Sequence, residues 1–251
     1  MSGHSKWSSI KHKKGAADAK RGKLFSKLTR ALIVAAKEGG PDPAGNLALQ
    51  NAIEKARAAS MPKDNIDRAI AKGSGTDSDS ASYETVIYEG YGPAGVAVIV
   101  EALTDNRNRT AGEVRHTFAK NDGNLGTSGA VAWLFERRGI VLVPAAGADE
   151  DELTLAAAEG GADDVSLDGS SYEVLTAAEE LAAVRAAVAG AGFEIESAEL
   201  TMLPKTTVAV EDENEAKTIL RLIDQLEEND DVQEVYANFD IPERVLESVA
   251  G

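Results

Sequence analysis

The hydrophobic pattern of this chain changes at one polar segment, and that change limits the folds open to it. Before the segment, apolar residues recur every three or four positions, as in amphipathic helices. After it, strand-like stretches alternate with helical ones. The segment itself, Ser74–Ala81, has the serine, glycine and aspartate composition of a linker. The sequence therefore predicts a multidomain α+β chain in which a helical domain precedes two α/β domains.

Three short helices are predicted before the linker. The first begins near Gly22 and is stopped by the glycines and prolines of 39–43. The others cover about 48–59 and 62–73, the last with a proline in its first turn. The apolar residues that share one face of the first helix are Phe25, Leu28, Leu32, Ala35 and Ala36.

Strands and helices alternate after the linker. Strands are predicted over 83–91 and 95–103 with a tight turn at Gly92–Pro93, a helix over 108–120, and strands over 131–135 and 140–143. Residues 140–203 have the order strand, helix, strand, strand, helix, strand, which is the ferredoxin-like arrangement. A strand over 206–210, a helix over 213–228 and a strand over 232–238 would complete the sheet begun at residue 83. The predicted domains are thus 1–75, 82–138 with 204–240, and an inserted domain over 139–203.

Charge is divided unevenly along the chain, whose net charge is −16. Residues 1–75 hold 15 Lys and Arg against 6 Asp and Glu, a net charge of +9. The remaining residues hold 11 basic and 36 acidic side chains, a net charge of −25. Such a molecule can present its cationic end to a phosphate backbone while its acidic part is repelled by nucleic acid.

The first thirty residues contain the chemistry expected of a nucleic-acid interface. Lysine and arginine neutralise phosphates, tryptophan stacks on unpaired bases, and histidine stacks or forms hydrogen bonds. The alternative is a solvated basic tail whose tryptophan packs into the helical core. The candidate nucleic-acid-binding residues are His4, Lys6, Trp7, Lys11, His12, Lys13, Lys14, Lys20, Arg21, Lys23, Lys27 and Arg30.

A second candidate anion site lies where a predicted strand leads into a helix. Asp105 or Asn106 would cap that helix, and the free N–H groups of its first turn would attract an anion. Arg107 and Arg109 would add positive charge, with Asn108 between them. The alternative is a capped strand-to-helix turn in which both arginines pair with acidic neighbours.

Enzyme and membrane functions have little support in the sequence. The chain has no cysteine and three histidines, His4, His12 and His116, which lack metal-ligand spacing. Neither a GxSxG motif nor a Walker A loop is present. The acidic run Asp149–Glu152 is predicted to begin a helix, with a divalent-ion site as the alternative. The longest apolar runs are too short for a membrane span. We expect a cytoplasmic, non-enzymatic protein without cofactor, metal, small-molecule substrate or membrane partner; the oligomeric state is not predicted.

Several short motifs, which occur in a fixed order along the chain, resemble those of the YebC family. This family includes the mitochondrial translational activator of cytochrome oxidase. The resemblance covers nearly the whole chain. It differs at Leu47, where the family often has proline, and in an alanine-rich inserted domain. The motifs are Gly3-His-Ser-Lys-Trp7, Lys11-His-Lys-Lys14, Asp18-Ala-Lys-Arg-Gly-Lys-Leu-Phe25, Gly39-Gly-Pro-Asp-Pro43, Met61-Pro-Lys-Asp-Asn-Ile66, Arg68-Ala-Ile-Ala-Lys-Gly73, Tyr88-Glu-Gly-Tyr-Gly-Pro93, Thr104-Asp-Asn-Arg-Asn-Arg-Thr110 and Gly123-Asn-Leu-Gly126.

The resemblance implies three domains, the third inserted into the second, and a regulator of gene expression. Family members are described in two ways: as DNA-binding transcriptional regulators, or as translation factors that bind the ribosome near the peptidyl-transferase centre and relieve stalling at consecutive prolines. The lysine-rich helix and its arm suit irregular RNA better than duplex DNA, whose readers use Arg, Asn or Gln on base edges. We therefore expect ribosomal RNA or the large ribosomal subunit as partner, with DNA as the alternative and a protein scaffold, acting through the acidic domains, as the third possibility.

Overall fold

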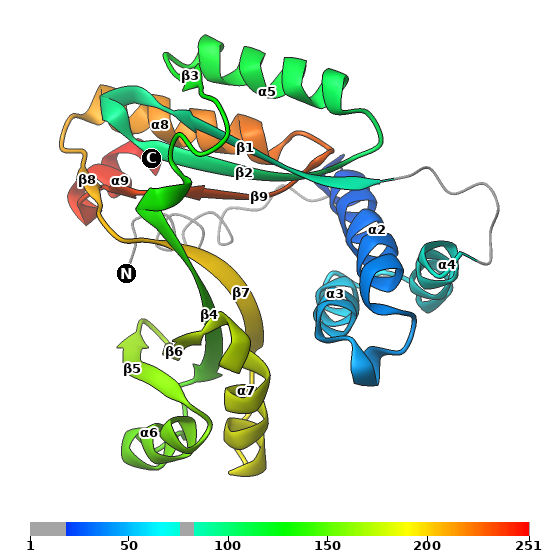
Figure 1. Cartoon of the computed structure of the whole chain (residues 1–251). Helices are drawn as coiled ribbons and strands as arrows, with labels where there is room; N and C mark the ends of the chain where they lie inside the picture. Colours follow the sequence, from blue (N-terminus) through cyan, green and yellow to red (C-terminus); the bar gives the residue numbers. More distant parts are fainter. Residues whose placement is uncertain (1–18, 76–82, 251) are drawn as a thin grey trace. The chain divides into compact units, whose positions relative to one another are not determined.

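The computed structural model describes residues 19–75 and 83–250 and divides into two compact units (Figure 1). The first unit is Met1–Phe135 with Pro204–Gly251, and the second is Glu136–Leu203. Helices at the N-terminal end are followed by two sheet-containing regions, so the predicted fold class is confirmed. The helices and the first sheet belong to one compact unit. The division of that unit at residues 75 and 82 remains our proposal.

The N-terminal helices of the first unit pack through small and branched apolar side chains. They are α2 (Ala19–Gly39), α3 (Leu47–Ala58) and α4 (Lys63–Gly73), with a 3₁₀ turn η1 (Pro43–Gly45) between the first two. Asn46 joins α2 to α3: its side chain accepts a hydrogen bond from the Leu49 N–H and donates to the Ala35 and Gly40 carbonyls. The predicted apolar face of α2 is confirmed, since Leu28 and Leu32 are buried in the shared core.

A four-stranded sheet forms the centre of the rest of this unit. Its strands are β1 (Glu84–Tyr91), β2 (Ala97–Thr104), β3 (Asn124–Leu125) and β9 (Val232–Ala237), in the order β3-β1-β2-β9. β2 pairs antiparallel with β1 on one side, with Tyr88 opposite Val100, and antiparallel with β9 on the other. The chain therefore returns to its first sheet after the second unit, as the sequence pattern predicts.

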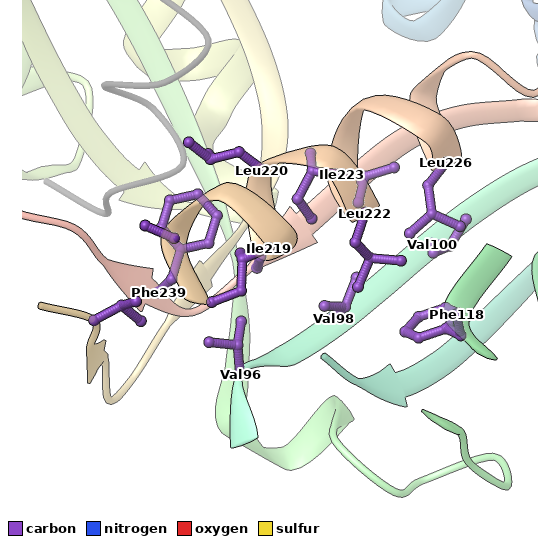
Figure 2. Close-up of a cluster of buried hydrophobic side chains, with 14 of the residues drawn as sticks. Val96, Val98, Val100, Phe118, Ile219, Leu220, Leu222, Ile223, Leu226 and Phe239 are labelled. Carbon is purple, nitrogen blue, oxygen red and sulfur yellow. The ribbon is translucent and has the colours of Figure 1, made fainter. Parts of the chain in front are cut away.

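Helices α5 (Arg107–Lys120) and α8 (Glu213–Glu227) pack beside each other on one face of this sheet (Figure 1). Figure 2 shows part of the core between these helices and the sheet, where apolar residues of α8 recur every three or four positions and meet alternate residues of β2. Phe118 fills the space under α5 and is fully buried. The labelled members of this core are Val96, Val98, Val100, Phe118, Ile219, Leu220, Leu222, Ile223, Leu226 and Phe239.

The second unit has the predicted βαββαβ order. It contains β4 (Phe135–Pro144), α6 (Glu150–Glu159), β5 (Ala162–Asp168), β6 (Ser171–Ala177), a 3₁₀ turn η4 (Ala178–Glu180), α7 (Leu181–Gly190) and β7 (Ser197–Pro204). The sheet order β5-β6-β4-β7 is that of a ferredoxin-like fold. The first residue of β4 and the last of β7 belong to the first unit. The chain therefore enters the second unit along β4 and leaves it along β7. Asp149 caps α6 by accepting the Glu152 N–H at 3.0 Å, which confirms the acidic run as a helix start.

Two local predictions, the strands over 131–135 and 206–210, were wrong, whereas the turn at Gly92–Pro93 is present but longer than predicted. Residues 131–135 are not a strand, because a 3₁₀ turn η3 (Ala132–Leu134) occupies them and β4 begins at Phe135. The Gly92–Pro93 turn extends into another 3₁₀ turn, η2 (Pro93–Gly95), in which Ala94 has a φ of 55°. The predicted strand over 206–210 shrinks to β8 (Val208–Ala209), which pairs with β10 (Phe239–Asp240) outside the main sheet. A final helix α9 (Glu243–Ala250), packed on α8, was not predicted.

Candidate nucleic-acid interface

The predicted nucleic-acid interface is only partly within the described residues. His4, Lys6, Trp7, Lys11, His12, Lys13 and Lys14 lie outside them. Lys20 and Arg21 belong to α2, and Lys23, Lys27 and Arg30 follow on the same helix. The positions of these last three side chains are described, and they share a face of α2 opposite the buried one.

Three cations of α2, Lys23, Lys27 and Arg30, contact the end of α8. The Lys23 ammonium donates to the Glu228 carbonyl at 3.3 Å, and the Lys27 ammonium donates to the Glu227 carbonyl. Arg30 donates to the Asp230 carbonyl. Carbonyls at a helix C-terminus lack partners within the helix and carry the negative end of its dipole. Part of the predicted basic face thus stabilises the α8 terminus, a contact between residues about two hundred positions apart that the sequence pattern did not reveal.

Asp231, just beyond that helix end, is the centre of a buried polar cluster. Its carboxylate is 4% exposed and accepts hydrogen bonds from the Arg109 guanidinium at 2.6 Å and the Thr110 hydroxyl at 2.7 Å. The Arg30 guanidinium lies 3.4 Å away. Burial by itself raises the pKa of Asp231, but these donors and positive charges outweigh it, so the pKa lies below its ordinary value. Asp231 is therefore a fixed anion that orients two arginines from different helices.

The second predicted anion site forms a capped turn. The Asn106 side chain caps α5 by accepting the Arg109 N–H at 3.1 Å. Arg109 is paired with both Asp105, at 3.0 Å, and Asp231, and these carboxylates raise its pKa further above its ordinary value. A doubly paired guanidinium has little charge left to attract an external phosphate.

The other two residues of that turn remain exposed. The Arg107 side chain is 65% exposed, and its guanidinium lies 3.7 Å from the Glu84 carboxylate, itself open to solvent. Exposed ion pairs of this kind are weak. Asn108 is also exposed. The anion site therefore stays a prediction for Arg107 and Asn108, whereas Asp105, Asn106 and Arg109 have structural partners.

A buried glutamate, Glu89, organises a neighbouring loop. This residue was not identified from the sequence. Glu89 on β1 accepts hydrogen bonds from the backbone N–H groups of Gly129, Val131 and Ala132 at 2.7, 2.8 and 2.7 Å. Burial raises its pKa, but the three N–H donors have the larger combined effect and lower it. In the sequence, Glu89 sits at an alternating strand position that looks solvent-facing, so nothing marked it as buried.

The loop held by Glu89 carries an exposed tryptophan. The Trp133 side chain is 65% exposed, and its indole N–H donates to the Ala130 carbonyl at 3.2 Å. The Tyr91 hydroxyl donates to the same carbonyl at 3.1 Å. Two aromatic side chains are therefore oriented by one backbone group on a loop that is itself fixed. Such a surface can contact a partner with little loss of side-chain entropy.

Other kinds of site find no support in the described part of the chain. No cluster of three or more His, Asp or Glu side chains is arranged there to hold a metal ion. None of the helices within residues 19–75 and 83–250 combines the length and the apolar character that a membrane span requires.

Comparison with known proteins identifies relatives over nearly the full chain. Residues 5–76 match the model of the TACO1/YebC protein N-terminal domain, and residues 83–239 match that of the TACO1/YebC second and third domain. A protein of Rubrobacter xylanophilus named "Probable transcriptional regulatory protein" is 60% identical over 251 residues, all of both chains. One of Geobacter sulfurreducens with the same description is 55% identical, over 99% of this chain and all of its own. The crystal structure of a conserved hypothetical protein from Aquifex aeolicus, 51% identical, superposes with a TM-score of 0.81 over 91% of this chain and 93% of that one.

Proposed function

Because this chain belongs to the TACO1/YebC family, we propose that it is a nucleic-acid-binding regulator of gene expression whose partner is ribosomal RNA. In this proposal it acts as a non-enzymatic translation factor. It binds the large ribosomal subunit near the peptidyl-transferase centre and relieves stalls at proline stretches. The basic arm and the N-terminal helices make the RNA contact.

The separation of charge is the observation that supports this proposal. Residues 19–75 contain 11 Lys and Arg against 5 Asp and Glu, whereas the second unit, 136–203, contains 3 against 15. The arm adds further lysines to the basic end. Cations attract the phosphate backbone, and the acidic unit is repelled by it. The protein can therefore bind an RNA site through its basic N-terminal residues without binding polyanions over its whole surface.

The geometry of α2 favours RNA over duplex DNA. A helix that reads the major groove needs an open face with side chains that reach base edges. The polar face of α2 carries mainly lysines, and Lys23, Lys27 and Arg30 on it contact the end of α8, so this face is not open for reading base edges. Basic groups distributed over short helices and an arm match the irregular surface of folded RNA.

A transcriptional role is the second candidate, and the names of the curated relatives favour it. In that case the same basic end would bind DNA. A scaffold function, in which the acidic units bind a basic protein, is a third candidate, supported by the charge of residues 136–203.

Sedimentation of the tagged full-length protein in cell lysate separates these candidates. We expect co-migration with the large ribosomal subunit, and we expect Lys11→Glu/Lys13→Glu/Lys14→Glu to abolish it. The matched control is Lys205→Glu/Lys217→Glu/Arg244→Glu, which makes the same change of charge at exposed positions outside the basic end. Tight binding to one promoter fragment without ribosome association would overturn the proposal in favour of transcription. Salt-insensitive binding to one purified protein, without nucleic acid, would favour the scaffold function.

A further inference from the structure

An open groove of about 420 Å³ lies between α2 and α4, and of its lining residues only Arg30 was among the candidate nucleic-acid-binding residues of the sequence analysis. Its volume is within the range of ordinary ligand sites. The side chains that give it chemical character are Phe25 and Arg30 from α2, Asn65, Arg68 and Lys72 from α4, and Tyr83, which precedes β1.

The packing of the two helices explains why a groove forms there. At the C-terminal end of α4, a Cβ on Gly73 would lie 2.3 Å from the Ile33 carbonyl oxygen, so the two backbones touch at that point. Nearer the start of α4, the side chains of Asn65 and Arg68 line the groove. Asn65, Arg68 and Lys72 are spaced three and four residues apart and therefore share the face of α4 that lines the groove.

The lining of the groove is cationic. It contains Arg30, Arg68 and Lys72 and no Asp or Glu side chain. Arg68 is oriented by neutral acceptors, the Asp64 carbonyl at 3.1 Å and the Asn65 side-chain oxygen at 2.7 Å, which leave its positive charge uncompensated. Lys72 is half-buried, and within the described residues it has no ion-pair partner. Arg30 also contacts Asp231, so Arg68 and Lys72 carry most of the charge available to a ligand.

Aromatic surface accompanies these cations. Phe25 and Tyr83 both line the groove and are half-buried. The Arg30 guanidinium lies 5.8 Å from the centre of the Tyr83 ring, a cation–π distance that holds the ring in place. Basic groups beside aromatic rings are the combination that binds single-stranded nucleic acids, with cations on phosphates and rings beside bases.

We propose that the α2–α4 groove binds one nucleotide of a single-stranded RNA, with Arg68 and Lys72 on the phosphate and Phe25 and Tyr83 beside the base. This inference rests on the proposed RNA-binding function and adds a specific subsite to it. Asn65 acts as a positioning residue because its side chain holds Arg68.

The test is the affinity of the full-length protein for a labelled oligouridylate, measured by fluorescence anisotropy at several potassium chloride concentrations. Arg68→Gln/Lys72→Gln should raise Kd about tenfold and reduce the salt slope by about 1.4, because each lost phosphate contact on a single strand accounts for about 0.7. The control is Arg57→Gln/Lys63→Gln, which removes the same charge from exposed positions of α3 and α4 outside the groove. A second variant, Ser26→Glu, places a carboxylate at the groove edge without removing a cation and should also weaken binding.

The outcomes distinguish this inference from the proposed function. If both groove variants bind oligouridylate like the control pair, or if the unmodified protein does not bind it, the subsite is overturned. If the groove variants lose binding but the protein does not sediment with ribosomes, the subsite stands and the ribosomal function is refuted. Loss of ribosome association in the arm variant, with groove variants unchanged in both assays, supports the function and overturns the groove.

Discussion

Replacing Glu89 with glutamine tests whether one buried carboxylate organises the loop that carries Trp133. One carboxylate oxygen accepts the Val131 and Ala132 N–H groups, and the other accepts that of Gly129. Glutamine preserves the shape but turns one oxygen into an NH₂ group, so at least one backbone N–H loses its acceptor. An unsatisfied buried donor costs about 1–3 kcal/mol, and the remaining hydrogen bonds lose the contribution of the charge. We expect the free energy of unfolding of the first unit to fall by about 3 kcal/mol.

Urea unfolding followed by tryptophan fluorescence measures this effect. The chain has two tryptophans, so a Trp7→Phe background leaves Trp133 as the reporter on the loop itself. For a urea m-value of about 2 kcal/mol per M, a loss of about 3 kcal/mol lowers the midpoint by about 1.5 M. The Trp133 emission of the folded variant should also shift, because the loop that orients the ring is released.

The matched control is Glu84→Gln, the same substitution on the same strand. The Glu84 side chain is 47% exposed, and its contact with Arg107 is a surface ion pair. Its loss should change the free energy of unfolding by less than about 1 kcal/mol. Equal midpoints for the Glu89 and Glu84 variants, with unchanged Trp133 emission, would refute the reasoning.

The stability difference between the unmodified protein and Glu89→Gln should depend on pH in a definite direction. The pKa of Glu89 is lower in the folded protein than the value of about 4.3 expected in the unfolded chain. Its ionised form therefore stabilises the fold fully above that unfolded value, and the stabilisation is lost as the pH falls through the folded pKa. The stability difference between the unmodified protein and Glu89→Gln should be constant near neutrality and shrink in acid below about pH 4.

Two further substitutions test contacts that join distant segments. Asp231→Asn should lower the free energy of unfolding by about 2 kcal/mol, because the amide replaces a charged acceptor in the buried cluster. Asp105→Asn, at the exposed partner of the same arginine, should lower it by less than about 1 kcal/mol. Equal losses for the two variants in thermal unfolding would contradict a buried role for Asp231. Gly73→Ala should lower the free energy of unfolding by about 1–2 kcal/mol, because the new methyl group meets the Ile33 carbonyl. The control Gly22→Ala, which has open space around it, should leave that free energy unchanged or raise it by up to about 1 kcal/mol. Thermal unfolding measures both. A stabilising Gly73→Ala would show that α4 does not approach α2 so closely.

Much of the fold could be predicted because local periodicity reports which face of an element is buried. The three- and four-residue spacing of Phe25, Leu28 and Leu32 predicted the buried side of α2, and the order of elements from 140 to 203 predicted the ferredoxin-like unit. Local propensity failed where backbone conformation depends on distant groups. The segment over 131–135 has strand-forming residues, but the Glu89 carboxylate binds its N–H groups and a 3₁₀ turn forms instead.

The candidate site shows the same division. The sequence by itself determined the sign of the charge in each segment of the chain and the helix that bears part of the positive charge, because charge and periodicity are properties of neighbouring residues. Only the tertiary structure decided which cations have internal partners. Arg30 and Lys27 reach carbonyls about two hundred residues away, and Arg68 and Lys72 line a groove between two helices that approach closely at Gly73. A cation's partner depends on which groups the folded chain brings within a few ångströms, and that proximity is not encoded in any local pattern.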